Sequence, residues 1–301
     1  MKPLALVYFL LGSISVYTNA ADQMDFVEVS AGVFVFEGEI KDIFASKDGM
    51  VSNVTFVIGK RAVAVVDTGA SLNQGKLIRQ AIRKETQLPI EYVINTHVHL
   101  DHIFGNQAFV ADAPEFVAHI NFQQELAAKG VYYQSRMQTA EFAGSEIVEA
   151  TRLISKTETI NLGDRPLRLI AAQRAHTNHD LMVYDINTAT LIAGDLVFVD
   201  HCPVIDGSLS GWLAVLADIE KLDFSTLVPG HGSVQRDKSA LTKMTGYFSG
   251  LQAAVRTAID EQIYLGVASD TLLLDQAPHW ILFDEYHKRN VIAAYTELEW
   301  E

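Results

Sequence analysis

Residues 96–102 read Thr-His-Val-His-Leu-Asp-His, so three histidines and one aspartate fall within six positions, 97–102. His97 and His99 are two residues apart, and in an extended segment their side chains project from the same side. Asp101 and His102 follow where the chain turns or begins a helix, which aims them at a neighbouring point. Neutral imidazole and carboxylate are the usual ligands of zinc and related metals. The run therefore predicts a loop that feeds two adjacent metal positions, rather than a solvated His-rich loop.

Four ligands on one short loop do not close a two-metal site, so other segments must contribute. Three further polar side chains each follow an apolar, strand-like run: His176, Asp195 and His231. Residues at the carboxyl ends of strands gather at one edge of layered α/β folds, where catalytic groups are common. Each of the three is weak evidence alone, but together and in this order they predict that the site is completed there.

The rest of the chain alternates between strand-like and helical patterns. Strands are expected in two short runs within 26–36 with a turn at Ala31-Gly32, and at 51–58, 62–66, 92–95, 116–118, 158–162, 167–171, 181–184, 191–193 and 227–228. Helical spacing is expected over 72–86, 122–150, 211–221, 238–263 and 281–298. This order fits an α/β fold of two sheets covered by helices, a four-layer αββα sandwich, better than a single parallel sheet.

Residues 1–20 have the pattern of a secretory signal peptide. Lys2 precedes eight apolar residues at 4–11, and small or polar residues lead to a cleavage position after Ala20. Eight apolar residues fall well short of the roughly 20 that a membrane anchor needs. We therefore expect residues 21–301 to form one mature, exported domain, periplasmic or secreted, without stable membrane insertion after cleavage.

Composition excludes some classes of function. The chain has 37 acidic and 23 basic side chains, a net charge of −14, and no cluster of Lys and Arg, which argues against a nucleic-acid partner. About half of its residues are apolar, enough for a sizeable core. Cys202 is the only cysteine, so no internal disulfide forms, and it is interpreted as a buried filler rather than a nucleophile.

Taken together, these motifs resemble the metallo-β-lactamase superfamily of hydrolases, from the Asp67-Thr68-Gly69 turn to the Gly230-His231-Gly232 turn. The resemblance implies an αββα fold with the site at one edge of the two sheets. It assigns His97, His99 and His176 to a first metal, and Asp101, His102 and His231 to a second, with Asp195 bridging both. It also makes Asp67 a buried support of the ligand loop and places His179 near the site without ligating. Ala175 and Asn178 depart from the usual family residues, but neither change removes a ligand.

The resemblance implies two zinc ions as cofactors, although the same ligands accept iron or manganese. A hydroxide shared by the two metals would attack an ester, thioester, amide or lactone-like bond of a small-molecule substrate. Asp101 and Asp195 are the candidate catalytic residues, with Asp101 preferred as the proton shuttle. Because the resemblance makes Asp195 a bridging carboxylate, the chain resembles the general hydrolase branch of the superfamily more than the antibiotic-cleaving branch.

Three stretches, at 125–133, 198–212 and 283–291, look like the exported quinoprotein relay system zinc metallohydrolases. That likeness implies a link to periplasmic pathways with pyrroloquinoline quinone enzymes, and a partner in such a system. Two other functions stay open: a β-lactamase, and a non-catalytic accessory protein that binds metal or quinone on the same scaffold.

Some residues near these motifs admit two interpretations. His201, Asp206 and Ser208 either line the substrate mouth or belong to an ordinary surface loop. Helical spacing favours core packing over a pocket role for Tyr132 and Tyr133. The other histidines, at 119, 279 and 287, are expected to be structural or solvated, and the three tryptophans to be buried.

Overall fold

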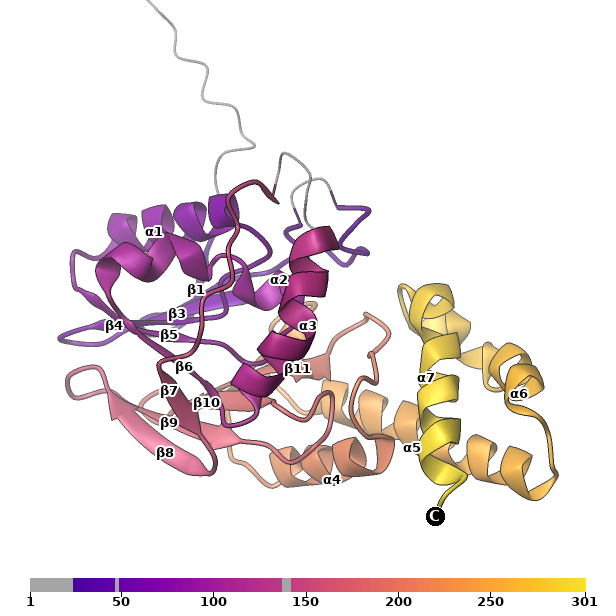
Figure 1. The fold of residues 1–301 in the computed structure, drawn as a ribbon. Helices are drawn as coiled ribbons and strands as arrows, with labels where there is room; N and C mark the ends of the chain where they lie inside the picture. The colour runs from indigo at the N-terminus through magenta and orange to yellow at the C-terminus, as the bar shows by residue number, and fades with distance from the viewer. Residues whose placement is uncertain (1–23, 47–48, 137–141) are drawn as a thin grey trace, which may run out of the picture.

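The structure is a computed structural model that describes residues 24–46, 49–136 and 142–301. The predicted signal peptide, residues 1–20, lies outside the described residues. Two sheets form the centre of the molecule, and Figure 1 shows helices covering the outer face of each. The predicted α/β fold with an αββα arrangement is confirmed. Among the described residues, no helix combines the length and apolarity needed to cross a bilayer.

The first sheet has seven strands in sequential order, antiparallel from β1 to β4 and parallel from β4 to β7. Its strands are β1 (Val27–Ser30), β2 (Val33–Phe36), β3 (Val54–Ile58), β4 (Val63–Val66), β5 (Ile90–Ile94), β6 (Glu115–His119) and β7 (Arg152–Ile154). The turn between β1 and β2 has Gly32 at φ 68°, a backbone region that glycine adopts without steric cost.

The second sheet has five strands in the order β12-β11-β10-β9-β8, and only its β11–β12 pair is parallel. Its strands are β8 (Thr157–Asn161), β9 (Pro166–Ala171), β10 (Leu181–Asp185), β11 (Thr190–Phe198) and β12 (Thr226–His231). Residues from both sheets, among them Ile94, Val117, Leu169 and Val183, form one buried cluster between the sheets. This shared core holds the strand ends of the two sheets at fixed positions relative to each other.

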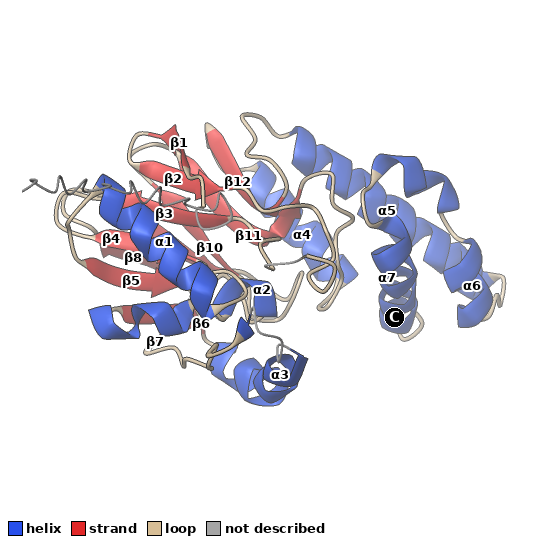
Figure 2. Ribbon diagram, turned by 90° about the horizontal axis from the view of Figure 1, so that it is seen from above, coloured by secondary structure: helices blue, strands red, loops and turns tan. Residues whose placement is uncertain are grey.

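The α-helices of the described chain are α1 (Leu72–Glu85), α2 (Leu100–Ile103), α3 (Phe122–Arg136), α4 (Leu209–Glu220), α5 (Ser239–Asp260), α6 (Leu265–Thr271) and α7 (Phe283–Leu298), with 3-10 helices η2 (Asn106–Asp112) and η4 (Leu274–His279). Ile78 and Ile82 of α1 are fully buried against the first sheet. The apolar faces of α4, α5 and α7 form one cluster with β11 of the second sheet. In Figure 2, α5, α6 and α7 gather at one end of the molecule.

Two differences from the sequence pattern concern residues near the site. The helix expected over 122–150 ends at Arg136, and the described residues 142–150 form no α-helix. Strand β7 follows at 152–154, where no strand was expected. The strand expected at 191–193 continues to Phe198, because a register shift at Gly194, with φ 54°, lets β11 carry on past it. Asp195 therefore lies inside a strand rather than just after one.

Candidate metal centre

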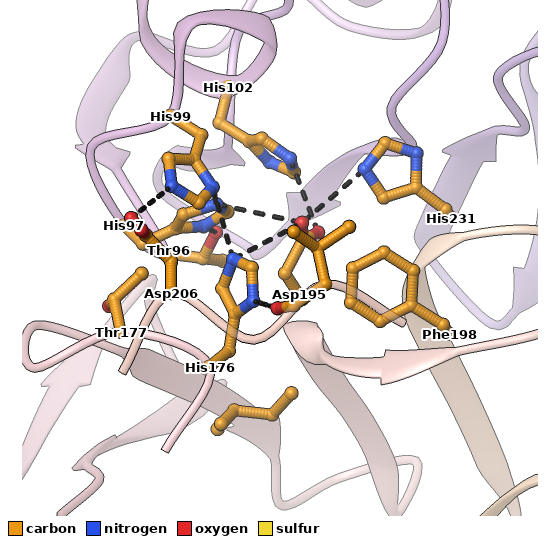
Figure 3. Close-up of polar contacts among 12 residues, drawn as sticks. Thr96, His97, His99, His102, His176, Thr177, Asp195, Phe198, Asp206 and His231 are labelled. Carbon is orange, nitrogen blue, oxygen red and sulfur yellow. Dashed lines mark hydrogen bonds and ion pairs between the residues drawn. The ribbon is translucent and has the colours of Figure 1, made fainter. Parts of the chain in front are cut away.

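The structure brings all seven predicted ligand residues to one place. The loop after β5 supplies His97 and His99, and α2 begins immediately after it. Helix α2 carries Asp101 and His102. The loop between β9 and β10, strand β11 and the end of β12 supply His176, Asp195 and His231 (Figure 3). The ligand atoms form two groups, one of His97, His99, His176 and Asp195, the other of Asp101, His102 and His231.

In the first group three imidazole nitrogens converge. His99 Nδ1 lies 3.0 Å from His97 Nε2 and 3.0 Å from His176 Nε2. Asp195 Oδ2 lies 3.6 Å from His97 Nε2 and 3.5 Å from His176 Nε2. These separations are close to the ~3.4 Å expected between ligand atoms that surround one zinc ion tetrahedrally at about 2.1 Å.

The hydrogen bond at His97 Nδ1 determines which of the two ring nitrogens carries the proton. Thr96 Oγ1 donates its only hydrogen to Asp67 Oδ2 at 2.7 Å. The 3.0 Å contact between Thr96 Oγ1 and His97 Nδ1 therefore requires that Nδ1–H donates. His97 Nε2 then holds a lone pair that faces the convergence point.

The same logic applies to the other two histidines of this group. His176 Nδ1 lies 2.7 Å from the carbonyl of Val204, which only accepts. His99 Nε2 lies 3.1 Å from Asp206 Oδ2, an acceptor when ionised. With these donors on the outside, three lone pairs face each other with no proton between them, an arrangement that a cation stabilises.

In the second group, histidine nitrogens surround two carboxylates. His102 Nε2 lies 3.5 Å from Asp101 Oδ2 and 3.2 Å from Asp195 Oδ1. His231 Nε2 lies 3.3 Å from Asp101 Oδ2 and 3.4 Å from Asp195 Oδ2. Asp195 Oδ2 is thus within 3.6 Å of a histidine nitrogen from each group, which is the position of a bridging ligand.

The outer nitrogens of this group are held as well. His102 Nδ1 lies 2.8 Å from Asp67 Oδ2, and His231 Nδ1 lies 2.9 Å from the carbonyl of Val51. Asp67 does not join either ligand group, and it holds His102 and Thr96 from behind. His102 Nε2 and Asp195 Oδ1 are buried and have no hydrogen-bond partner among the described residues, so the site contains unsatisfied polar atoms aimed inward.

The electrostatics of the two groups differ. Burial lowers the pKa of His176 to about 3 and lowers the pKa of His97 well below its usual value, so both are neutral, as ligands must be. Burial lowers the pKa of His231 too, but Asp195 and Asp101 raise it to about 9 overall. Without a cation, protons on the second group therefore neutralise the carboxylates, and a metal would replace those protons.

The residues present fit two divalent cations. The donors are imidazole nitrogens and carboxylate oxygens, the spacing matches tetrahedral coordination, and the outer nitrogens are fixed by acceptors. Phe198 supports both groups, since its ring stacks on His231 at 5.2 Å and meets His176 edge-on at 5.8 Å. The metal identity does not follow from this donor set, which also suits iron and manganese.

A pocket of about 450 Å³ opens above the ligands. His201 and Asp206 line it, whereas Ser208 caps α4 and hydrogen-bonds Glu297. The expectation of core packing is wrong for Tyr132, which is 61% exposed, whereas Tyr133 packs against a buried cluster as expected. Both also line the pocket. Their helix α3 buries Phe122 and Leu126 in that cluster and presents its tyrosines at the site.

Sequence reasoning missed the outer residues of the pocket. Phe44, Arg136 and Arg289 line it together with Tyr286. The first two carry no sequence signal, because their segments are far apart in the chain and meet only in the folded protein. Tyr286 and Arg289 are three residues apart in a helical pattern, and this spacing places them on one face of the helix. That spacing is the sequence signal from which their shared position could have been predicted.

His179 and the other histidines are not part of the ligand groups. His179 is buried, and its Nδ1 lies 3.1 Å from Thr177 Oγ1. His119 accepts a hydrogen bond from the amide of Asn121, and His287 lies between Tyr247 and the carbonyl of Leu272. Cys202 and Trp212 are fully buried, as expected, but Trp300 is 84% exposed, which the sequence did not predict.

Comparison with known sequences gives a family match. The sequence model described as the metallo-beta-lactamase superfamily matches residues 48–231, which include all seven ligand residues. A linear primary-alkylsulfatase of Pseudomonas sp. (strain ATCC 19151) is 42% identical over 48 residues, 16% of this chain and 9% of that protein. The alpha subunit of the 2,4-dinitroanisole O-demethylase of Nocardioides sp. (strain JS1661) is 25% identical over 193 residues, 63% of this chain and 55% of that protein. The chain matches less than two thirds of the length of either relative.

Solved structures share the fold. A metallo-beta-lactamase from Pontibacter korlensis has a TM-score of 0.63 at 18% identity, over 75% of this chain and 99% of that one. The metallo-beta-lactamase from Hirschia baltica has a TM-score of 0.60 at 19% identity, over 75% of this chain and 97% of that one. At these identities the likeness concerns the fold alone.

Proposed function

The chain belongs to the metallo-beta-lactamase superfamily as a metal-dependent hydrolase, and on that premise we propose that it is an exported dinuclear enzyme that cleaves an ester, thioester, amide or lactone-like bond of a small molecule. The observation that carries the proposal is the position of Asp195, whose Oδ2 lies 3.4–3.6 Å from histidine nitrogens of both ligand groups. A carboxylate there supports two cations at once.

Two divalent cations bound by these groups would act as Lewis acids toward a substrate oxygen and lower the pKa of bound water toward 7. The residues of the chain do the remaining work. Asp101 lines the pocket, so its Oδ2 is placed to accept a proton during the reaction. Ser52 Oγ holds the backbone carbonyl of Asp101 at 2.5 Å, which fixes the position of that carboxylate.

Ionisation of both carboxylates agrees with these roles. Burial opposes the charged form of Asp101, but the nearby His102 and His231 outweigh it and lower its pKa to about 2. Asp195 is affected in the same way, with His231 and His102 lowering its pKa well below the usual value. Both carboxylates are therefore ionised at neutral pH, the form in which carboxylates bind cations.

Export and a quinoprotein-linked role are part of the proposal. The pattern of residues 1–20 supports export to the periplasm or the medium, and the stretches at 125–133, 198–212 and 283–291 support the link to a quinoprotein pathway. The N-terminal sequence of protein recovered from the periplasm tests export: a start at Ala21 supports it, and an intact Met1 in the cytoplasm contradicts it.

Metal content and hydrolysis are the direct test. Elemental mass spectrometry of the protein should find two metal ions per chain. The purified protein should then turn over at least one of an aryl ester, S-lactoylglutathione, a chromogenic cephalosporin and an alkyl sulfate. Fewer than one metal after reconstitution overturns the dinuclear site, and turnover of the cephalosporin alone would make the chain a β-lactamase.

The variant Asp101→Asn distinguishes an enzyme from a non-catalytic accessory protein. It keeps the shape of the side chain but removes its charge. An enzyme loses turnover in this variant. If turnover is absent in both forms and metal is bound equally, the accessory role as a metal-binding or quinone-binding protein is favoured instead.

A further inference from the structure

The pocket has a polar floor and an aromatic wall. Its floor is formed by ligand residues, including Asp101 and His231. Tyr133 of α3 meets the ring of His99 edge-on, with centroids 6.4 Å apart. Tyr286 of α7 stacks on the ring of His201 at 5.3 Å. A flat apolar body entering the pocket would therefore meet tyrosine rings from two helices.

The mouth of the pocket is positively charged, although the chain has a net charge of −14. Four cations line it: Lys41, Lys129, Arg136 and Arg289. Of these, Lys129 is paired with Asp206 at 2.7 Å, and Lys41 with Glu39 at 2.6 Å.

Arg136 and Arg289 differ from the two lysines. Both are exposed, and neither has a carboxylate partner among the residues that the structure describes. Arg136 lies over the ring of Phe44, 4.7 Å from its centroid, which restrains the guanidinium at the mouth. Within the described part of the chain, neither guanidinium at this opening is balanced by an ion pair.

The other acids of the pocket, Asp206 and Asp42, offset this charge only in part. Asp206 accepts hydrogen bonds from His99 and Lys129. Asp42 accepts the amide of Phe44 at 2.9 Å and faces the hydroxyl of Tyr286 at 3.4 Å. Lys129 balances the charge of Asp206, whereas the partners of Asp42 are neutral and leave its charge in place. Two arginines therefore face one unbalanced carboxylate at the mouth, and the excess charge there is positive.

Arg289 and Tyr286 come from a part of the chain outside the shared family match. That match ends at residue 231, whereas both residues lie on α7. The approach to α7 is tied to the site, because the amide of Cys202 donates to the carbonyl of Ile281 at 2.9 Å and the amide of Ile281 donates to the carbonyl of Asp200 at 2.7 Å. Figure 1 shows α7 and α3 as separate helices, and the pocket takes residues from both.

We propose that the substrate carries a carboxylate at the end remote from the bond that is cleaved, and that Arg136 and Arg289 bind it while Tyr133 and Tyr286 enclose an aromatic or apolar body. The guanidinium fork matches the two oxygens of a carboxylate. A pocket of about 450 Å³ accommodates a small molecule with both parts. This inference rests on the proposed hydrolase function and adds its substrate class.

A matched pair of aryl acetates tests the inference. 4-Acetoxyphenylacetate carries the remote carboxylate, and 4-acetoxyphenylacetamide has the same shape without the charge. The metal-loaded protein should cleave the acid with a kcat/KM at least tenfold above that of the amide. Arg136→Ala and Arg289→Ala should each raise KM for the acid about tenfold, the loss of one charge-assisted hydrogen bond, and leave kcat unchanged.

Lys288→Ala is the matched control, because Lys288 precedes Arg289 on α7, is exposed, and pairs with Asp270 rather than lining the pocket. It removes the same charge at nearly the same place in the chain. Equal kcat/KM for the two acetates overturns the inference, as does an effect of Lys288→Ala equal to that of Arg289→Ala.

A binding measurement separates failure of the inference from failure of the proposed function. Calorimetry on the metal-loaded protein should show 4-hydroxyphenylacetate binding at least tenfold tighter than 4-hydroxyphenylacetamide, with the difference reduced in both arginine variants. If neither acetate is cleaved but this preference holds, the proposed ester hydrolysis fails and the carboxylate subsite stands. If both acetates are cleaved and the preference is absent, the subsite fails and the hydrolase stands.

Discussion

Asn290 holds the chain on both sides of Val204. From α7, its Oδ1 accepts the amide of Ile205 at 2.9 Å, and its Nδ2 donates to the carbonyl of Pro203 at 2.6 Å. The carbonyl between these two contacts, that of Val204, accepts the Nδ1–H of His176. A fully buried amide on the last helix therefore positions the group that fixes the orientation and tautomer of a metal ligand.

Replacing Asn290 with Ala should weaken metal binding at the first ligand group by about tenfold, since partners of metal-bound histidines contribute 10- to 100-fold to affinity. Competition with a chromogenic chelator measures this. Tyr295→Phe is the control, because it removes a hydrogen bond of α7 to the carbonyl of Ile263, away from the site. The idea fails if the two variants lose metal equally readily.

Asp67→Asn should lower metal affinity at the second group by 10- to 100-fold. Asp67 accepts from Thr96 N and Thr96 Oγ1 as well as from His102 Nδ1, and an amide cannot accept all three. The backbone of Asp67 has φ 58°, a region that asparagine tolerates, so the variant should fold. Chelator competition is again the measurement, and unchanged affinity would show that the charge of Asp67 is not needed behind His102.

Gly230→Ala should displace the bridging carboxylate. A Cβ at this position would overlap Asp195 Oδ1. We expect the variant to bind fewer than two metal ions per chain, counted by elemental mass spectrometry. Gly246→Ala is the control, because a Cβ there meets no atom within 4 Å and the residue lies in α5, where alanine is favoured over glycine. Two metals in Gly230→Ala would mean that Asp195 has room to move.

The sequence was sufficient for the ligand cluster and for every strand except β7, because these features depend on local patterns. The run at 96–102 has its ligands within one loop, and the apolar runs before His176, Asp195 and His231 each form a strand. Strands of this kind are recognised by short β-branched stretches between turns. The αββα arrangement followed from their order along the chain.

What the sequence did not indicate depends on contacts between distant segments. Helix α6 has only seven residues, and no periodic pattern marks it. The mouth of the pocket combines Phe44, Arg136 and Arg289, which are far apart in the chain and meet only in the folded protein. Trp300 is exposed although large aromatic residues are usually buried, which composition alone does not reveal.

The metal-free protein should become less stable as the pH rises from about 6.5 through about 9. In the folded protein burial lowers the pKa of His231, but Asp195 and Asp101 raise it to about 9, above the usual value of 6.5. A histidine whose folded pKa is raised stabilises the fold fully below its unfolded pKa, and that contribution is lost as the pH passes the folded value. The melting temperature of chelator-treated protein should fall by several degrees across this range.

The metal-loaded protein should not share this loss of stability over the same range. A cation bound to the second group takes the place of the proton on His231, so raising the pH removes a competitor and strengthens metal binding. The difference in melting temperature between loaded and metal-free protein should therefore grow from pH 6.5 to pH 9. A constant difference would mean that no proton leaves the second group when metal binds. His231 Nε2 lies 3.3 Å from Asp101 and 3.4 Å from Asp195. With a constant difference, these contacts in the metal-free protein would have to be stabilised by something other than a proton that metal displaces.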